Sequence, residues 1–195
     1  RQAIELARQQ KISLYLVGGT IRDLLLGREI RDYDFVIKEA ATNFPNRLAD
    51  LINANLFPMG KGRRKQVHRL VKENKTIDFS FMIYDDIEQD LRRRDFTINA
   101  IAYSCAEGRF FSIPRAMEDL KVGRIDLVSS QALEADPLRM LRAVRYRCTL
   151  PGFDLTERLK REIKQCKGSL VEVAPERIRA ELDEIILSPS SAQGL

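Results

Sequence analysis

The segment DYDFVI at residues 32–37 alternates acidic and apolar side chains, and this alternation limits how the chain can fold. Successive side chains of a β-strand point to opposite faces, so Asp32 and Asp34 share one face while Tyr33, Phe35 and Ile37 share the other. The apolar face is expected to enter the core of a sheet. The two carboxylates then converge on the opposite face, either as ordinary solvated charges or as ligands of a cation.

A turn and a helix that favour phosphate precede this strand. ISLYLV at 12–17 has the composition of a strand, and GGTIRDLLLG at 18–27 follows it. Gly18 and Gly19 allow a tight turn and a close approach of a ligand to the backbone. The start of the helix presents backbone N–H groups and the positive end of the helix dipole, which suit phosphate. This signal is weak by itself, and the nearby carboxylates strengthen it.

An anion cradle beside paired carboxylates predicts nucleotidyl transfer. Mg²⁺ prefers oxygen ligands and commonly joins a carboxylate to a substrate phosphate. Two such ions can activate an attacking hydroxyl and stabilise the leaving oxygen, so we expect a two-ion Mg²⁺ site. The pattern G-x-x-x-x-G-K-[ST] does not occur in the chain, which disfavours a kinase or ATPase of the P-loop type.

The remaining pattern predicts an α/β first part and an all-helical second part. Two strands near 66–72 and 76–82 form a hairpin around the turn KENK. Asp78 lies on the second of these strands, and a strand adjacent to 32–37 would bring it to Asp32 and Asp34 as a third carboxylate. Further helices are expected at the following positions: 3–10, 45–54, 95–103, 136–148, 156–166 and 175–187. A short strand-turn piece is expected around 109–128.

Composition limits the class of protein and its partners. The 33 Lys and Arg exceed the 28 Asp and Glu, and positive charge concentrates at 61–65, 91–94 and 139–147, which suits a polyanion such as nucleic acid as well as ordinary solvated faces. The three cysteines are far apart and His68 stands alone, so neither a zinc site nor a disulfide framework is expected. No apolar run is long enough to span a membrane and no signal peptide is visible, so we expect a cytoplasmic protein without a membrane partner. Because residue 1 is not Met and the last residues are rich in Ser and Pro, we expect a fragment of a longer protein.

Three motifs in this order resemble a known family. They are LVGGTIRDLLLGREIRDYDFVI (16–37), DLRRRDFTINAIAY (90–103) and DPLRMLRAVRY (136–146). Together they are similar to class II tRNA nucleotidyltransferases, which are CCA- or CC-adding enzymes, and to bacterial poly(A) polymerases. The resemblance covers roughly residues 12–187. It implies a polymerase-β-type nucleotidyltransferase head with a small mixed sheet (1–125), followed by an all-helical, base-selecting neck (126–195) that continues beyond the fragment.

The resemblance also implies roles for residues of the first two motifs. It assigns Gly18, Gly19 and Arg22 to the triphosphate, and Asp32 and Asp34 to catalytic Mg²⁺. The family places an acidic residue on the adjacent strand, where this chain has Asp78.

The second motif, RRDFTIN, places Asp95 and Asn99 four residues apart, on one face of the expected helix. The resemblance implies that Arg94 and Asp95 contact the ribose and the neighbouring phosphates. A capping salt bridge is the alternative.

The third motif suggests how a base is chosen. A carboxylate accepts a hydrogen bond from an exocyclic amine and a guanidinium donates to ring acceptors, so Asp136 and Arg139 suit cytosine or adenine better than guanine or uracil. The resemblance agrees, because the family uses E-D-x-x-R as an amino-acid template. This chain has Ala135 at the first acidic position. Arg142 and Arg145 continue the basic helix toward the nucleotide or the primer.

The expected activity is the metal-dependent, template-independent addition of CMP, with or without AMP, to the 3′ end of tRNA, with release of pyrophosphate. The connection between Asp78 and RRDFT is short, whereas family members that add the terminal A carry a longer loop there, which slightly favours CC addition over CCA addition. The alternatives are a poly(A) polymerase and, more distantly, a non-catalytic RNA-binding module. The expected partners are therefore tRNA and CTP, ATP or both, and the sequence does not determine the oligomeric state.

Overall fold

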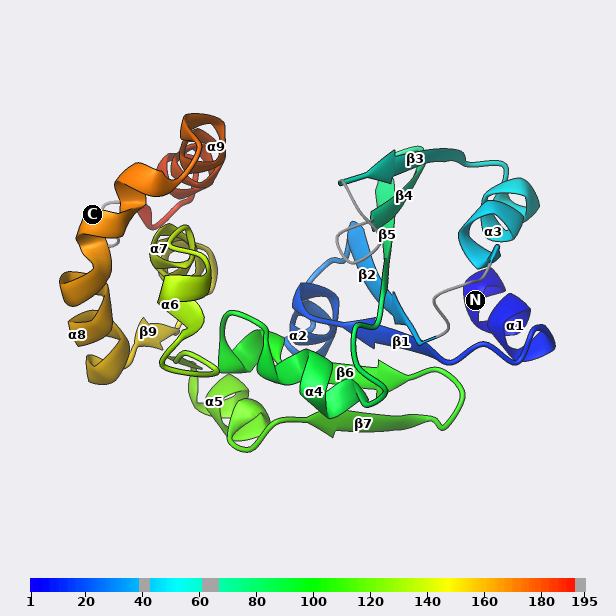
Figure 1. The fold of residues 1–195 in the computed structure, drawn as a ribbon, viewed down its shortest axis with the longest axis horizontal. Helices are drawn as coiled ribbons and strands as arrows, with labels where there is room; N and C mark the ends of the chain where they lie inside the picture. Colours follow the sequence, from blue (N-terminus) through cyan, green and yellow to red (C-terminus); the bar gives the residue numbers. More distant parts are fainter. Residues whose placement is uncertain (39–42, 61–66, 192–195) are drawn as a thin grey trace. The chain divides into compact units, whose positions relative to one another are not determined.

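The computed structural model describes residues 1–38, 43–60 and 67–191, which form two compact units. Unit 1 comprises residues 1–91 and 101–113, and unit 2 comprises residues 92–100 and 114–195 (Figure 1). Residues 92–100 therefore belong to unit 2, although the residues on both sides of them in the sequence belong to unit 1. The predicted division into a catalytic head (1–125) and a base-selecting neck (126–195) assigns a function to each part, and it stays a prediction.

Unit 1 is a seven-stranded mixed sheet with helices, as the α/β prediction requires. Its strands lie in the order β3-β4-β5-β2-β1-β6-β7, with β2 and β5 parallel and the other pairs antiparallel. Its elements are α1 (Gln2–Gln9), β1 (Leu14–Val17), α2 (Gly19–Leu25), β2 (Asp32–Ile37), α3 (Phe44–Ile52), β3 (Asn55–Met59), β4 (Val67–Lys72), β5 (Lys75–Phe81), α4 (Ile87–Arg92, whose last residue falls in unit 2), β6 (Ile101–Ser104) and β7 (Arg109–Ser112).

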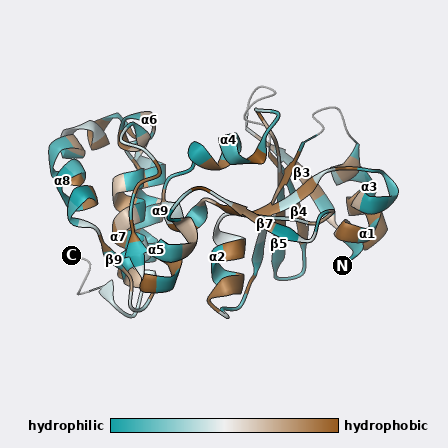
Figure 2. Cartoon of the chain, turned by 90° about the horizontal axis from the view of Figure 1, so that it is seen from below, coloured by the Kyte–Doolittle hydropathy of each residue, from teal (hydrophilic) through white to brown (hydrophobic). Residues whose placement is uncertain are grey.

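The core of unit 1 lies between α1, α3 and one face of the sheet. Phe35 and Ile37 of β2 are buried there with Leu14 of β1, Leu70 of β4 and Phe79 of β5. The alternation in DYDFVI is thus confirmed. In Figure 2 the strands carry both hydrophobic and hydrophilic segments. The face of β2 that carries Asp32 and Asp34 is turned away from this core.

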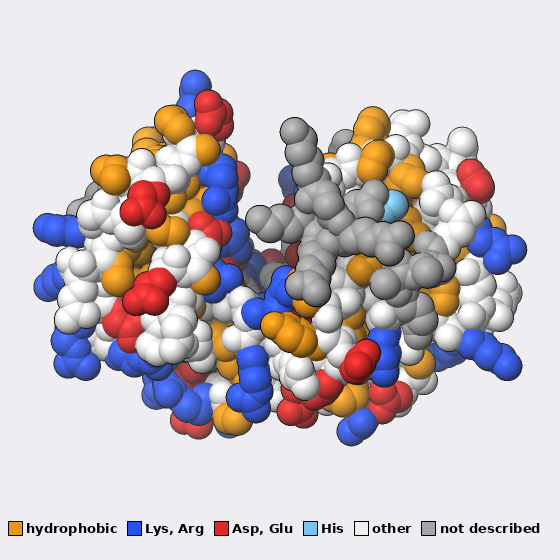
Figure 3. Space-filling model, in the orientation of Figure 1, with side chains coloured by type: hydrophobic (Ala, Val, Ile, Leu, Met, Phe, Trp, Pro, Cys, Tyr) orange, Lys and Arg blue, Asp and Glu red, His pale blue; other side chains and the backbone are white. Residues whose placement is uncertain are grey.

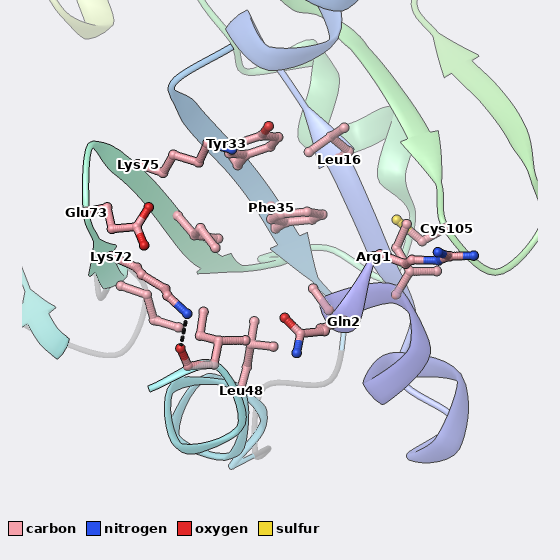
Figure 4. Close-up of a pocket in the computed structure, with 15 residues that line it drawn as sticks. Arg1, Gln2, Leu16, Tyr33, Phe35, Leu48, Lys72, Glu73, Lys75 and Cys105 are labelled. Carbon is pink, nitrogen blue, oxygen red and sulfur yellow. Dashed lines mark hydrogen bonds between the residues drawn. The ribbon is translucent and has the colours of Figure 1, made fainter. Parts of the chain in front are cut away.

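A cavity of about 440 Å³ opens on the apolar side of the sheet. Tyr33, Phe35 and Leu16 line it from the strands (Figure 4). At its rim the ammonium of Lys72 donates a 2.6 Å hydrogen bond to the carbonyl of Ile52. Because Tyr33 and Phe35 alternate with Asp32 and Asp34 along β2, this cavity lies on the opposite face from the predicted catalytic carboxylates.

Unit 2 is mainly helical, with one short parallel strand pair. Its elements are η1 (Thr97–Asn99), α5 (Ala116–Val122), β8 (Arg124–Ile125), α6 (Ala132–Ala135), α7 (Arg139–Thr149), β9 (Asp154–Leu155), α8 (Glu157–Cys166), η2 (Lys167–Glu172) and α9 (Pro175–Ile186). The predicted helices near 156–166 and 175–187 are confirmed. Pro175 begins α9, as expected for a residue that has no N–H to leave unpaired.

The helix predicted over 95–103 is wrong. The segment forms a single 3₁₀ turn, η1, and then the strand β6, whose Ala102 pairs with Val17 of β1. The Asp95 carboxylate accepts a 2.8 Å hydrogen bond from the backbone N–H of Phe96, and such local bonds compete with helix formation. The strand-turn piece expected at 109–128 also contains a helix, α5, which ends at Gly123 in the left-handed conformation.

Candidate active site

The Gly-Gly turn, α2 and β2 form the first part of the site, and all three belong to unit 1. Gly18 has φ 65° and ψ −135°, a conformation that residues with a Cβ rarely adopt. Its N–H donates to the carbonyl of Ile101 on β6, which holds the turn against the sheet. The choice of glycine at position 18 is thus required by the backbone itself.

Thr20 connects this turn to both predicted catalytic aspartates, a role that the sequence pattern did not indicate. Its buried hydroxyl donates to the carbonyl of Asp32 at 3.2 Å and accepts from the backbone N–H of Asp34 at 2.8 Å. One side chain therefore fixes the start of α2 relative to the two positions that carry carboxylates. The threonine in GGT was the available sequence signal.

Arg22, predicted to bind the triphosphate, is held by its neighbour. Its guanidinium donates to both oxygens of Asp23, at 3.0 and 2.8 Å, and its side chain is almost fully buried beneath the turn. The guanidinium lies 3.5 Å from the point where a side chain at Gly19 would begin. Arg22 thus supplies positive charge directly under the Gly-Gly turn.

The third carboxylate lies beside the other two. β2 and β5 are parallel neighbours, and their register pairs Asp34 with Asp78. Arg69 on β4 stands opposite Asp78 and donates to both of its oxygens, at 2.8 and 2.7 Å. The hydrogen bond to Asp78 raises the pKa of Arg69 against the lowering effect of burial, and the charges of Asp78, Asp32 and Asp34 add to it.

The donor set fits a hard cation. Asp32 is exposed and Asp34 is half-buried, and they carry oxygen ligands on one face of one strand. Among the residues that the structure describes, no group of three or more His, Cys, Asp or Glu side chains is placed to hold a metal ion. A magnesium site here would therefore rest on two carboxylates, with water and substrate phosphate completing the shell, as this ion commonly accepts.

Asp95 is the centre of a second cluster, within unit 2. One of its oxygens accepts from Asn99 at 2.9 Å, and the other accepts two bonds from Arg142, at 3.0 and 2.7 Å. Burial by itself would raise the pKa of Asp95, but the charge of Arg142 and the bonds from Asn99, Arg142 and Phe96 outweigh it and lower that pKa. The predicted proximity of Asp95 and Asn99 is confirmed, although they are not on a helix.

The arginines of α7 are held by internal partners. Glu181 of α9 pairs with Arg145 at 2.6 Å and with Arg142 at 3.5 Å. Tyr146 accepts hydrogen bonds from Asn99 and Arg142, and the Arg145 guanidinium lies 4.4 Å from the centre of its ring. The sequence pattern did not indicate the roles of Glu181 and Tyr146. Figure 3 shows charges of both signs interspersed on the visible face of each unit. The predicted basic run at 61–65 lies outside the described residues.

Asp136 and Arg139 lie at the start of α7. Asp136 accepts from the N–H of Leu138 at 3.3 Å and from Arg177 of α9 at 2.8 Å. Arg139 donates to three backbone carbonyls, those of Arg93, Arg94 and Ala132, at 3.0, 3.3 and 3.2 Å. The backbone carbonyl of Arg94 thus helps to position Arg139. The family motif has an acidic residue where this chain has Ala135, and here backbone carbonyls orient the guanidinium of Arg139.

Two family models match separate parts of the chain. The model of the poly A polymerase head domain matches residues 14–126, which is more than half of the chain. The chain belongs to this family. A second model, described as a probable RNA and SrmB-binding site of polymerase A, matches residues 152–195. The resemblance that the three motifs indicate is therefore confirmed.

Individual relatives differ in the reaction that their names describe. A CC-adding tRNA nucleotidyltransferase of Synechocystis sp. is 36% identical over 92% of this chain and 43% of its own length. An A-adding tRNA nucleotidyltransferase of Deinococcus radiodurans is 37% identical over 92% of this chain and 41% of its own. The chain therefore spans less than half the length of these two relatives.

A solved structure shares the fold. The Thermotoga maritima CCA-adding enzyme, in complex with tRNA, superposes with a TM-score of 0.87 at 29% identity, over 99% of this chain and 47% of that one. The predicted fold class, a mixed sheet with helices followed by a mainly helical part, is thus confirmed, and the fold is similar to that of CCA-adding enzymes. No helix among the described residues is long and apolar enough to cross a bilayer.

We predict that Thr20→Val destabilises the protein by about 1–3 kcal/mol, because the carbonyl of Asp32 and the N–H of Asp34, in partly buried hydrogen bonds, lose their partner. Urea unfolding measures this change. Thr20→Ser keeps the hydroxyl and should stay near the wild-type value. Thr97→Val is the matched control, because the buried Thr97 hydroxyl has no hydrogen-bond partner among the described residues; an equal loss in both valine variants would contradict the role given to Thr20.

Asp95→Asn is expected to destabilise the protein by about 3 kcal/mol at pH 7, because it removes one partner of a buried ion pair. The folded-state pKa of Asp95 is lowered, so its contribution is present above the unfolded-state pKa, about 3.9, and is lost as the pH falls through the folded-state value. The difference from wild type should therefore shrink below about pH 4 in unfolding curves. Asp183→Asn, in an exposed pair with Arg179, should cost less than about 1 kcal/mol at every pH.

Proposed function

We propose that the chain carries the catalytic head and the base-selecting neck of a template-independent RNA nucleotidyltransferase that adds CMP, with or without AMP, to the 3′ end of tRNA. One observation carries the proposal: Thr20 joins the Gly-Gly turn to β2 between Asp32 and Asp34, so a phosphate site and a carboxylate pair form one unit. Membership of the poly A polymerase head family and the names of the relatives support it.

Each predicted site residue of the head has a proposed role in this reaction. Asp32 and Asp34 would hold Mg²⁺, which activates the terminal 3′ hydroxyl and stabilises the departing pyrophosphate when bound. The Gly18–Gly19 turn would let the triphosphate approach the start of α2, whose first N–H groups and the charge of Arg22 would bind it, while the N–H of Gly18 stays on the carbonyl of Ile101. Asp78 keeps Arg69 in place on the same face. The protein contributes mainly positioning and electrostatic stabilisation, which are the main needs of phosphoryl transfer.

The neck residues would choose the base and support the ribose. Asp136 accepts from an exocyclic amine, and Arg139, which its three carbonyl partners orient, donates to a ring acceptor. Cytosine and adenine present an amine there, while uracil and guanine present a carbonyl that would meet the carboxylate lone pairs. Arg94, Asp95 and Asn99 are proposed for the ribose and phosphates. In that case Arg142 and Arg145 act mainly by holding Asp95 and Glu181.

Within the enzyme class we favour CC addition over CCA addition. After β5 ends at Phe81, five residues lead to α4, which begins at Ile87. The longer loop of family members that add the terminal A has no counterpart in this short connection. The alternatives are a poly(A) polymerase and a non-catalytic RNA-binding module, and each predicts a different outcome in the experiment that follows.

The first experiment is extension of a tRNA that lacks its 3′ CCA, with CTP alone, ATP alone and both, in Mg²⁺ and at single-nucleotide resolution. We expect two C residues and a stop, even with ATP present. Addition of CCA would contradict the preference for CC, and a long A tail with ATP alone would replace the proposal by poly(A) synthesis. Binding of the tRNA without any extension would favour the non-catalytic module.

Asp32→Asn and Asp34→Asn should each lower the extension rate by at least about a hundredfold, because each removes a charged ligand of the proposed Mg²⁺ site. Single-turnover extension at saturating CTP measures this rate, and thermal unfolding shows whether each variant is folded. Asp85→Asn, in an exposed turn of the same unit, is the control and should keep the wild-type rate. A folded Asp32→Asn variant with a near-wild-type rate would remove Asp32 from the site.

A further inference from the structure

Four side chains form a row across the carboxylate face of the sheet in unit 1. The register pairs Phe57 of β3 with Arg69 of β4, Arg69 with Asp78 of β5, and Asp78 with Asp34 of β2. Residues paired in this way project from the same face, so we call these four the Phe57–Asp34 row. Neighbouring strands lie about 4.8 Å apart, so the row is about 14 Å long.

The neighbouring positions confirm the orientation of the row. The core on the other face of the sheet contains Leu56, Leu70 and Ile77. Each of them is the neighbour in sequence of one residue of the row: Phe57, Arg69 or Asp78. Phe57 therefore points away from the core. It is 50% exposed, although it is a large aromatic residue on a strand. An exposed ring on a sheet can stack with a nucleotide base.

Arg69 offers positive charge in the middle of the row. Its side chain is 40% exposed, and its bonds to Asp78 use the Nε and one terminal nitrogen. Among the described residues Asp78 is its hydrogen-bond partner, and a guanidinium has five N–H donors, so the others remain for an anion. Because Asp78 holds the guanidinium from one side, little side-chain freedom is lost when Arg69 binds a phosphate.

Strand order gives the two sides of the carboxylates different neighbours. The Gly-Gly turn follows β1, on one side of β2, whereas β5, β4 and β3 lie on the other side. In an in-line displacement the attacking hydroxyl and the leaving pyrophosphate stand on opposite sides of the reacting phosphorus. If the triphosphate lies at the Gly-Gly turn, the acceptor strand must therefore approach over β5, β4 and β3.

We propose that the Phe57–Asp34 row binds the single-stranded 3′ end of the acceptor RNA, with a base stacked on Phe57 and a phosphate paired with Arg69. The inference rests on the proposed function and extends it to the path of the acceptor. It assigns Phe57 and Arg69 to RNA binding, and it leaves the incoming nucleotide to the Gly-Gly turn.

The test for Phe57 separates stacking from packing. Phe57→Leu should raise KM for the RNA acceptor at least about fivefold, with KM for CTP unchanged, because a stacked base is lost. Phe57→Trp keeps an aromatic ring and should keep KM for the RNA acceptor near the wild-type value. Phe110→Leu is the matched control, since Phe110 is 44% exposed on β7, at the other edge of the same sheet. Equal KM values in the two leucine variants, or full activity in Phe57→Leu, would overturn the stacking role.

The test for Arg69 uses salt. Arg69→Gln should weaken binding of a fluorescent single-stranded RNA 3′ end and reduce the slope of log affinity against log salt by about 0.7, the value for one phosphate contact. Phe57→Leu should leave this slope unchanged. Arg109→Gln is the control, since Arg109 also pairs with a carboxylate, that of Glu107, but lies on β7 at the other edge of the sheet. An unchanged slope in Arg69→Gln would overturn the phosphate contact.

The outcomes distinguish this inference from the proposed function. If the wild-type chain extends RNA and the Phe57 and Arg69 variants behave like their controls, the function stands and the row is not the acceptor site. If the wild-type chain neither extends nor binds RNA, the proposed function fails and the inference fails with it. Raised KM values for both CTP and RNA in Phe57→Leu would indicate general damage to the sheet and would also overturn the inference.

Discussion

Phe35 and Phe79 stack in the core of unit 1 with their ring centroids 5.4 Å apart, and Phe44 of α3 packs edge-on against Phe79. The two stacked rings are register partners on the parallel strands β2 and β5. Because side chains alternate, burial of this pair brings Asp34 and Asp78, one position earlier, together on the opposite face. A shift of either strand by one residue would turn its own carboxylate into the core, at a large cost in free energy. The hydrophobic core therefore determines where the charges of the site lie.

Unit 2 depends on a different interaction, the buried carboxylate of Asp95. It orders the turn at 96–99 through backbone and side-chain bonds and joins that turn to α7 through Arg142. Glu181 extends the same network to α9 through Arg142 and Arg145. The segment 92–100, although it lies between two parts of unit 1 in sequence, thus belongs to the helical unit. Its backbone carbonyls in turn orient Arg139, so the network that stabilises the fold also places the proposed base-selecting side chain.

Charge pairing in both units bears on how RNA would be held. Basic runs in the sequence suggested a general attraction for a polyanion, but Arg142 and Arg145 have acidic partners inside unit 2 and Arg22 is paired with Asp23. These three guanidiniums therefore contribute little to a diffuse basic surface. Arg69 differs because its pair with Asp78 lies on the open carboxylate face and leaves donors for a phosphate. Its position in the strand order suggests a specific path for the acceptor.

The sequence by itself determined the features that depend on neighbours in the chain. Alternation in DYDFVI predicted the buried and acidic faces of β2, the glycines predicted the turn at 18–19, and the motifs predicted the family. It did not show that Thr20 bridges Asp32 and Asp34, that residues 101–104 form a strand, or that Arg69 reaches Asp78. Those features depend on strand order and on contacts between distant segments. The local pattern at 95–103 even favoured a helix, because periodicity cannot register the pairing of Ala102 with Val17 that makes it a strand.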